Sequence, residues 1–289
     1  MSAISPLDGR YKKNVLELND FFSEQALMRS RLEVEVKYLI ALSQHRALKK
    51  ELSLKMGDEK ILHSFYENFD QKEYNVVKRI EAKTKHDVNA VVKYFSQKLE
   101  KNGYPHLVPF VHFGLTSEDI NNTAYSLMFQ RGLNGPLLKA LEGVSSLLVL
   151  LIKDTKDMSM LSLTHGQPAT TTTLGKEMAV FHSRLQRQVV YIKNHVLLAK
   201  FSGATGTFAA HNIAFPKESW SAFSAKFIRE LGLKNNPITT QIEPNDSIAE
   251  LLHAFVRTNN ILTDLCVDIW LYISRNIFKY QTFFCIFDL

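Results

Sequence analysis

Residues 163–170, which read LTHGQPAT, place a single histidine where a side chain could carry out chemistry. His165 stands between a threonine and a glycine, in a break between two periodic apolar segments rather than inside either of them. Backbone groups are free in such a break, so a side chain there can be aimed at a ligand. Because an ordinary histidine gains and loses its proton close to neutral pH, His165 is a candidate for proton transfer.

Four further polar segments stand at breaks in the apolar pattern or at the starts of predicted helices. Taken singly, each is explained more simply as a turn or a helix cap, because polar side chains at such places commonly serve the backbone. TSED, for example, has the pattern of a capping box that starts a helix at Thr116. The segments are SPLDGRY (5–11), KHDV (85–88), HFGLTSEDI (112–120) and TQIEP (240–244).

Several common kinds of active site are excluded by the sequence, which contains no GxSxG, HExxH or GxGxxG pattern. GQPATTTTLGK (166–176) resembles a phosphate-binding loop, but eight residues separate its glycines and Glu177 follows its lysine. The only cysteines, Cys266 and Cys285, form no CxxC pair and no Cys/His spacing suited to zinc. The residues therefore give no indication of a zinc site.

Nearly everything between the polar segments has the apolar spacing of helices. Two such patterns, from Leu174 to Val196 and from Ile248 to Ile273, span about 23 and about 26 residues. That is longer than a typical globular helix and indicates a bundle. We therefore predict an all-α fold.

One stretch rich in chain-breaking residues divides the predicted helices. NGYPHLVPF (102–110) contains two prolines and a glycine, which predict a domain boundary. We expect a small N-terminal helical domain at 1–110 and a domain of long bundled helices at 111–289. Within the second domain, Pro136 is well placed as the first residue of a helix.

The composition of the 289 residues, 45% hydrophobic and 22% charged, is typical of a soluble globular protein. The most apolar stretch, VSSLLVLLI (144–152), is too short to span a bilayer and predicts a buried helix. An N-terminus without a secretory signal and the lack of a disulfide framework favour the cytoplasm. The net charge of +6 suits either an anionic ligand or a solvated lysine surface, and no nucleic-acid-binding motif is present. We expect neither nucleic acid nor a membrane as a partner.

In this order and within these helices, the five polar segments resemble the adenylosuccinate lyases, a family within the fumarase/aspartase superfamily of helical lyases. The resemblance runs from about Ile4 to about Lys279, and THGQPAT and TSEDI carry it most strongly. DGRY and TQIEP narrow it to the adenylosuccinate branch. It implies a β-elimination that releases fumarate from adenylosuccinate to give AMP, and from the related imidazole-carboxamide ribotide in purine biosynthesis, without a cofactor. It also implies a homotetramer.

The resemblance assigns roles to individual residues. His165 would be the general acid, and His86 a second catalytic candidate near the succinyl or phosphate end of the substrate. Arg10 and Tyr11 match positions that hold the nucleotide phosphate, where a guanidinium fork suits phosphate oxygens. Thr116 and Ser117, at a predicted helix N-terminus, would contact a substrate carboxylate, since free amides and the helix dipole favour anions there. The substrate-binding candidates besides Arg10 and Tyr11 are Lys85, Asp87, Thr116, Ser117, Thr164 and Gln241.

The sequence departs from the family pattern in two places. SGATGTFAAH (202–211) is less rich in asparagine than close relatives usually are. After Lys279 the chain reads YQTFFCIFDL, where the superfamily has a serine-bearing loop with a Met-Pro-x-Lys-x-Asn run that supplies the base. We therefore expect a C-terminally incomplete chain. FFCIF (283–287) is uncharged and has high β propensity, which predicts aggregation.

Two alternative functions stay open. Another superfamily lyase, such as argininosuccinate lyase, shares the general pattern, although DGRY and TQIEP argue against it. A non-catalytic helical protein that retains ligand or subunit binding would agree with the missing serine loop.

Overall fold

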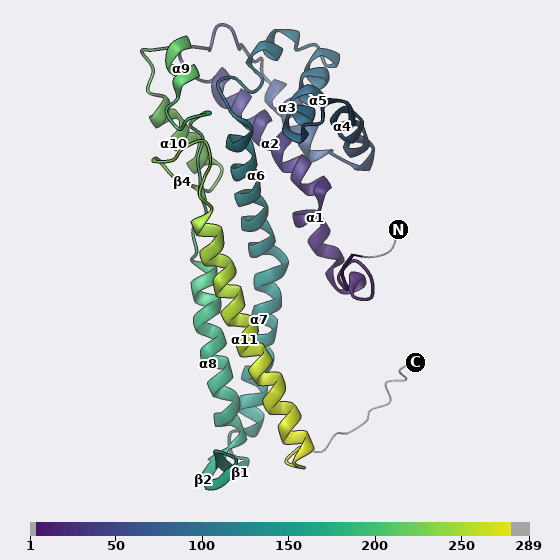
Figure 1. The fold of residues 1–289 in the computed structure, drawn as a ribbon, viewed down its shortest axis with the longest axis vertical. Helices are drawn as coiled ribbons and strands as arrows, with labels where there is room; N and C mark the ends of the chain where they lie inside the picture. The colour runs from purple at the N-terminus through teal and green to yellow at the C-terminus, as the bar shows by residue number, and fades with distance from the viewer. Residues whose placement is uncertain (1–3, 279–289) are drawn as a thin grey trace. The chain divides into compact units, whose positions relative to one another are not determined.

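The computed structural model describes residues 4–278, and these are mainly helical (Figure 1). The prediction of an all-α fold is confirmed, because the strands are few and short. The helices are η1 (Lys12–Leu18), α1 (Asn19–Phe22), α2 (Glu24–Ser43), α3 (Asp58–Glu67), α4 (Gln71–Thr84), α5 (Asp87–Lys101), η2 (Pro105–Phe110), α6 (Ser117–Gly132), η3 (Leu133–Leu137), α7 (Leu138–Thr155), α8 (Leu174–Lys193), α9 (Ala209–Ala214), α10 (Trp220–Glu230) and α11 (Asp246–Ser274). The strands are β1 (Ser159–Thr164), β2 (Gln167–Thr173), β3 (Leu198–Ala199) and β4 (Lys234–Asn235). The FFCIF segment and its predicted aggregation lie outside the described residues.

The chain forms two compact units, each of which is discontinuous in sequence. The first comprises residues 1–136 and 196–248, and the second residues 137–195 and 249–289. The boundary predicted between residues 110 and 111 falls inside the first unit, where Pro105 and Pro109 lie in the short helix η2 rather than in a linker. Tyr104 and Leu107 are buried there. The division into domains at 1–110 and 111–289 stays a prediction.

Helix α2 forms the centre of the first unit. Its apolar side chains are buried on every side rather than along one stripe, as expected for a helix enclosed by others. Helices α3, α5 and α6 pack against it. Its buried charges are paired: Arg131 contacts Glu33 through two hydrogen bonds of 2.6 Å. Because a buried charge is costly unless it is paired, these partners fix how α2 meets its neighbours.

The second unit contains the long helices α7, α8 and α11. The stripe predicted from Leu174 is buried through Ile192. Helix α8 ends at Lys193, and the side chain of its C-cap Asn194 donates to the Val190 carbonyl (2.9 Å). Helix α7 packs closely on α8: a Cβ added at Gly175 would lie 2.6 Å from the Lys156 Cα.

The stripe predicted along α11 is buried only in part: its Leu265 is buried, but its Leu252 is not. Leu251 and Ala254 are buried, whereas Leu252 and Val256 are about half exposed. Apolar residues lie on two faces of this helix, so their spacing alone does not decide which face is buried.

The apolar stretch 144–152 belongs to a longer helical run than the sequence indicates. Helices α6, η3 and α7 follow one another from Ser117 to Thr155, but the run is kinked at Gly135, whose backbone is not helical (φ −89°, ψ −106°). Pro136 follows this kink directly, as expected for the first residue of a helix. By length and composition, this is the one helix among the described residues that could cross a membrane, with 28% of its most apolar window buried. A core helix of a soluble protein passes the same test, so the finding is weak evidence for a membrane span.

Candidate active site

His165 lies at the tip of a β-hairpin in the second unit, not in an irregular loop. Strands β1 and β2 pair antiparallel, and the pair Thr164–Gln167 closes a two-residue turn. His165 and Gly166 have φ of 52° and 74°, as the central residues of a type I′ turn do. The side chains of Thr164 and His165 are exposed. The hairpin therefore presents the imidazole to solvent or to a ligand.

His86 caps the N-terminus of α5 in the first unit. Its Nδ1 accepts a hydrogen bond from the backbone N–H of Asn89 (3.2 Å). In the neutral ring Nε2 must then carry the hydrogen. Nε2 lies 3.5 Å from the hydroxyl oxygen of Ser117, the first residue of α6. The structure thus brings two predicted site residues together at the starts of two helices.

The chain on either side of His86 is shaped by a left-handed turn at Lys85 and by an ion pair between Asp87 and the buried Arg31. Lys85 has a left-handed backbone (φ 55°), which turns the chain from α4 into α5. Arg31 of α2 forms an ion pair with Asp87 (2.6 Å) and donates to the Asn121 side chain of α6 (2.9 Å). Burial alone would raise the pKa of the Asp87 carboxyl, but Arg31 and the Val88 amide outweigh burial and lower that pKa. Arg31 therefore joins the N-terminal parts of α5 and α6.

The N-terminus of α6 gathers three predicted substrate contacts. Thr116 is its N-cap, and its backbone N–H donates to the Asp119 carboxylate (2.9 Å), one half of the predicted capping box. Gln241, 125 residues away in the sequence, donates from Nε2 to the Thr116 hydroxyl (3.4 Å). Thr116, Ser117 and Gln241 thus surround a helix start, where amides and the helix dipole attract anions.

His112 and Glu35 form a hydrogen-bonded pair that the sequence analysis missed. His112 lies one turn before Thr116 with φ 59°, and its Nδ1 is 2.5 Å from the buried Glu35 carboxylate. Burial would lower the pKa of the imidazole, but the hydrogen bond and charge of Glu35 outweigh it and raise that pKa. In the sequence, this pair is indicated only by the presence of a histidine in the polar segment HFGLTSEDI, ahead of the predicted helix cap.

Arg10 and Tyr11 are not brought to this cluster by any polar contact. The Arg10 guanidinium stacks over the Tyr11 ring, 5.7 Å from its centroid, and both side chains are exposed. No hydrogen bond or ion pair joins them to the other candidates within residues 4–278. In the same range, no group of three or more His, Cys, Asp or Glu side chains could hold a metal ion.

Comparison with known proteins agrees with the resemblance seen in the motifs. The adenylosuccinate lyase of Legionella pneumophila (strain Corby) is 42% identical over 283 residues, which cover 98% of this chain and 62% of that protein. The enzyme of that name from Dictyostelium discoideum is 42% identical over 286 residues, covering 96% of this chain and 61% of the relative. That from Escherichia coli (strain K12) is 39% identical over 287 residues. The chain thus spans about three fifths of the length of these relatives.

Solved structures show the same fold. A fumarate lyase from Mesorhizobium sp. BNC1 superimposes with a TM-score of 0.72 at 23% identity, over 89% of this chain and 57% of the other. The β-carboxy-cis,cis-muconate cycloisomerase of Acinetobacter calcoaceticus superimposes with a TM-score of 0.71 at 20% identity, with the same coverage. The predicted fumarase/aspartase-like fold is confirmed. A family model described as lyase also matches residues 9–286. This chain therefore belongs to that lyase family.

Proposed function

We propose that this chain acts in the elimination of fumarate from adenylosuccinate, which leaves AMP, and from the related imidazole-carboxamide ribotide of purine biosynthesis. The observation that carries the proposal is the approach of His86 Nε2 to Ser117 at the N-terminus of α6, with Gln241 on the adjoining Thr116. A proton-carrying group beside an anion-binding helix end suits a substrate that bears carboxylates. The relatives named adenylosuccinate lyase support this choice of substrate.

In this elimination a base removes a proton next to a substrate carboxylate, the C–N bond breaks, and an acid protonates the departing nitrogen. Thr116 and Ser117 would hold the carboxylate, and His165 would supply the proton to nitrogen. His86 would act beside the succinyl or phosphate end. Positioned proton transfer of this kind is worth about 10²–10⁴ in rate.

The remaining candidates would bind the rest of the substrate. Arg10 and Tyr11 are exposed and stacked, which leaves the guanidinium free to take a phosphate in its fork. Lys85 would add a second cation, with Asp87, Thr164 and Gln241 as further contacts. No candidate residue is assigned as the base, and this keeps a non-catalytic ligand-binding chain as the alternative.

The proposal extends to assembly and location. Exposed apolar side chains on α11, including Leu252, Val256 and Trp270, would be covered in a homo-oligomer, for which the resemblance implies a tetramer. A cytoplasmic location agrees with nucleotide substrates.

Turnover and binding assays on the purified chain test the proposal. Adenylosuccinate and argininosuccinate are each offered, fumarate release is followed by absorbance, and binding by calorimetry. Fumarate released from adenylosuccinate alone supports the proposed reaction. Release from argininosuccinate alone would assign the chain to another lyase branch, and binding of adenylosuccinate without turnover would favour the non-catalytic alternative. A folded chain that neither binds nor converts adenylosuccinate refutes the proposed function.

A further inference from the structure

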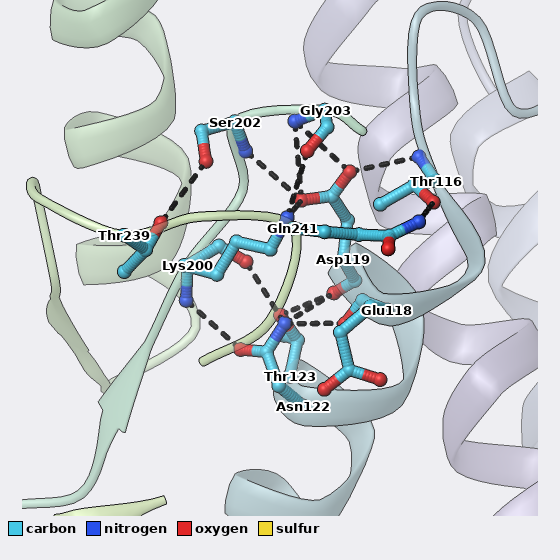
Figure 2. A network of polar contacts seen from close by, with 10 residues as sticks. All are labelled: Thr116, Glu118, Asp119, Asn122, Thr123, Lys200, Ser202, Gly203, Thr239 and Gln241. Carbon is cyan, nitrogen blue, oxygen red and sulfur yellow. Dashed lines mark hydrogen bonds and ion pairs between the residues drawn. The ribbon is translucent and has the colours of Figure 1, made fainter. Parts of the chain in front are cut away.

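An ion pair lies buried beneath the candidate site. Lys200 Nζ is 2.9 Å from Asp119 Oδ1, and both side chains are completely inaccessible to solvent. Figure 2 shows the contacts around this pair. Burying two charges is expensive, and an apolar pair of similar volume generally stabilises a fold equally well. Stability alone therefore does not account for this pair.

The Asp119 carboxylate joins two segments that are distant in the sequence. It accepts hydrogen bonds from the backbone N–H groups of Thr116 (2.9 Å), Ser202 (2.9 Å) and Gly203 (3.1 Å). With Lys200 included, its lone pairs are well satisfied. One side chain thus ties the start of α6 to the glycine-rich segment 202–206.

Lys200 is held at its backbone and at its ammonium group. Its backbone N–H donates to Asn122 Oδ1 (2.8 Å), and its carbonyl accepts from Asn122 Nδ2 (3.1 Å). At the other end, Nζ donates to the Gly203 carbonyl (2.9 Å). Asn122 lies one helical turn after Asp119. The backbone of Lys200, through Asn122, and its ammonium, through Asp119, are therefore both bound to the first turns of α6.

The segment 202–206 in turn contacts the segment that carries Gln241. Ser202 Oγ lies 3.4 Å from Thr239 Oγ1. A Cβ added at Gly206 would lie 2.2 Å from the Thr239 carbonyl oxygen, so these backbones approach closely. The Gln241 side chain in turn donates a hydrogen bond to the Thr116 hydroxyl, as Figure 2 shows. The ion pair is at the centre of this closed set of contacts.

The charges also matter for the ligand. An unneutralised Asp119 would place a negative charge within the first turn of α6, where it would repel a substrate carboxylate and offset the attraction of the helix dipole. The Lys200 ammonium neutralises that charge without reaching the solvent.

We propose that Asp119 and Lys200 are a positioning pair: they hold Thr116, Ser117 and Gln241 in place and keep the N-terminus of α6 electrostatically open to a substrate carboxylate. Neither touches the substrate, because both are fully buried. The identity of the ligand rests on the proposed function, whereas the positioning role does not.

Three variants test the pair. Lys200→Met removes the ammonium and leaves Asp119 charged; Asp119→Asn combined with Lys200→Met removes both charges. Arg131→Met is the control: Arg131 lies on the same helix as Asp119, about 18 Å away at 1.5 Å per residue, and its loss leaves the buried Glu33 of α2 without this ion pair. Amide hydrogen exchange at residues 116–118 and 202–203 is measured together with adenylosuccinate binding by calorimetry.

Lys200→Met should accelerate exchange at residues 202–203 and weaken adenylosuccinate binding at least about tenfold. The double variant should bind more tightly than Lys200→Met, because the repelling charge is gone, yet less tightly than the wild type. Arg131→Met should lower the unfolding midpoint while affinity changes less than about twofold. A purely structural role would make the double variant no better than the single one.

Three results would overturn the inference: unchanged exchange at 202–203 in Lys200→Met, wild-type affinity in that variant, or an equal loss of affinity in Arg131→Met. If Lys200→Met does not fold, amide exchange in the double variant tests the positioning role. Faster exchange at residues 202–203 than in the wild type supports that role, and unchanged exchange refutes it. A wild-type chain that binds no adenylosuccinate refutes the proposed function, and the exchange measurements then judge the positioning role alone.

Discussion

At the scale of single residues, two histidines have opposite surroundings. His165 is exposed on a hairpin tip, where proton transfer to a ligand is open to it. His211 is buried, its Nε2 meets the Tyr38 hydroxyl at 2.9 Å, and its Nδ1 has no hydrogen-bond partner among the described residues. The first suits catalysis and the second suits a neutral structural role.

Replacing His165 tests the proposed acid. His165→Ala should lower the rate of fumarate release about 100-fold or more and leave the helical circular dichroism unchanged, because the side chain is exposed. Asn tolerates positive φ, so His165→Asn should keep the turn (φ 52°) and lose the rate equally. A loss below about threefold in both variants would remove His165 from the mechanism.

The buried His211 predicts how stability depends on pH. Burial lowers its pKa to about 4, against the opposing charge of Asp119. A depressed pKa in the folded state means that its contribution is complete above the unfolded value of about 6.5 and is lost as the pH falls toward 4. That loss is roughly 3 kcal/mol in the free energy of unfolding.

Urea unfolding between pH 7 and pH 4 measures this effect. His211→Phe should lose less unfolding free energy over that range than the wild type, whatever its stability at pH 7. Parallel pH profiles for the two proteins would show that His211 is not the group responsible.

At the scale of elements, the candidate site depends on close approach between loops. Gly206 has φ 74°, and an added Cβ would clash with the Thr239 carbonyl oxygen. Gly206→Ala should therefore cost about 2–4 kcal/mol of unfolding free energy and displace the segment carrying Gln241, which would weaken adenylosuccinate binding.

Gly57→Ala provides the matched control, since Gly57 also has positive φ (98°) but nothing lies within 4 Å of an added Cβ. It should cost only about 1–2 kcal/mol in chemical unfolding and leave ligand affinity unchanged. Equal effects of the two substitutions on affinity would mean that the contact with Thr239 does not position the site.

At the scale of the whole molecule, apolar surface on α11 predicts self-association. Leu252→Lys combined with Val256→Lys should lower the association state in sedimentation velocity, because charged side chains disfavour a buried apolar interface. Met56→Lys, which changes a fully exposed apolar residue of the other unit, is the control and should have no effect. If the wild-type chain sediments as a monomer, or the double variant as the wild type does, this face is not an interface.

The sequence by itself determined the helical fold and the polar segments that carry the family resemblance. Helical spacing and the starts at Thr116 and His86 depend on residues within a few positions of one another, so they can be read directly from the chain. The sequence indicates only a break around His165, and the two-residue turn of the hairpin is seen in the structure alone.

Only the tertiary structure decided what supports the site. The hydrogen bonds that Ser202 donates to Asp119 and Gln241 donates to Thr116 join residues 83 and 125 positions apart, and no local pattern signals them. The same holds for the buried face of α11, since both faces of that helix are apolar. Lys200 is not singled out by any pattern in the sequence. Its burial follows from packing against Asn122 and Asp119, whose chain neighbours say nothing about that contact.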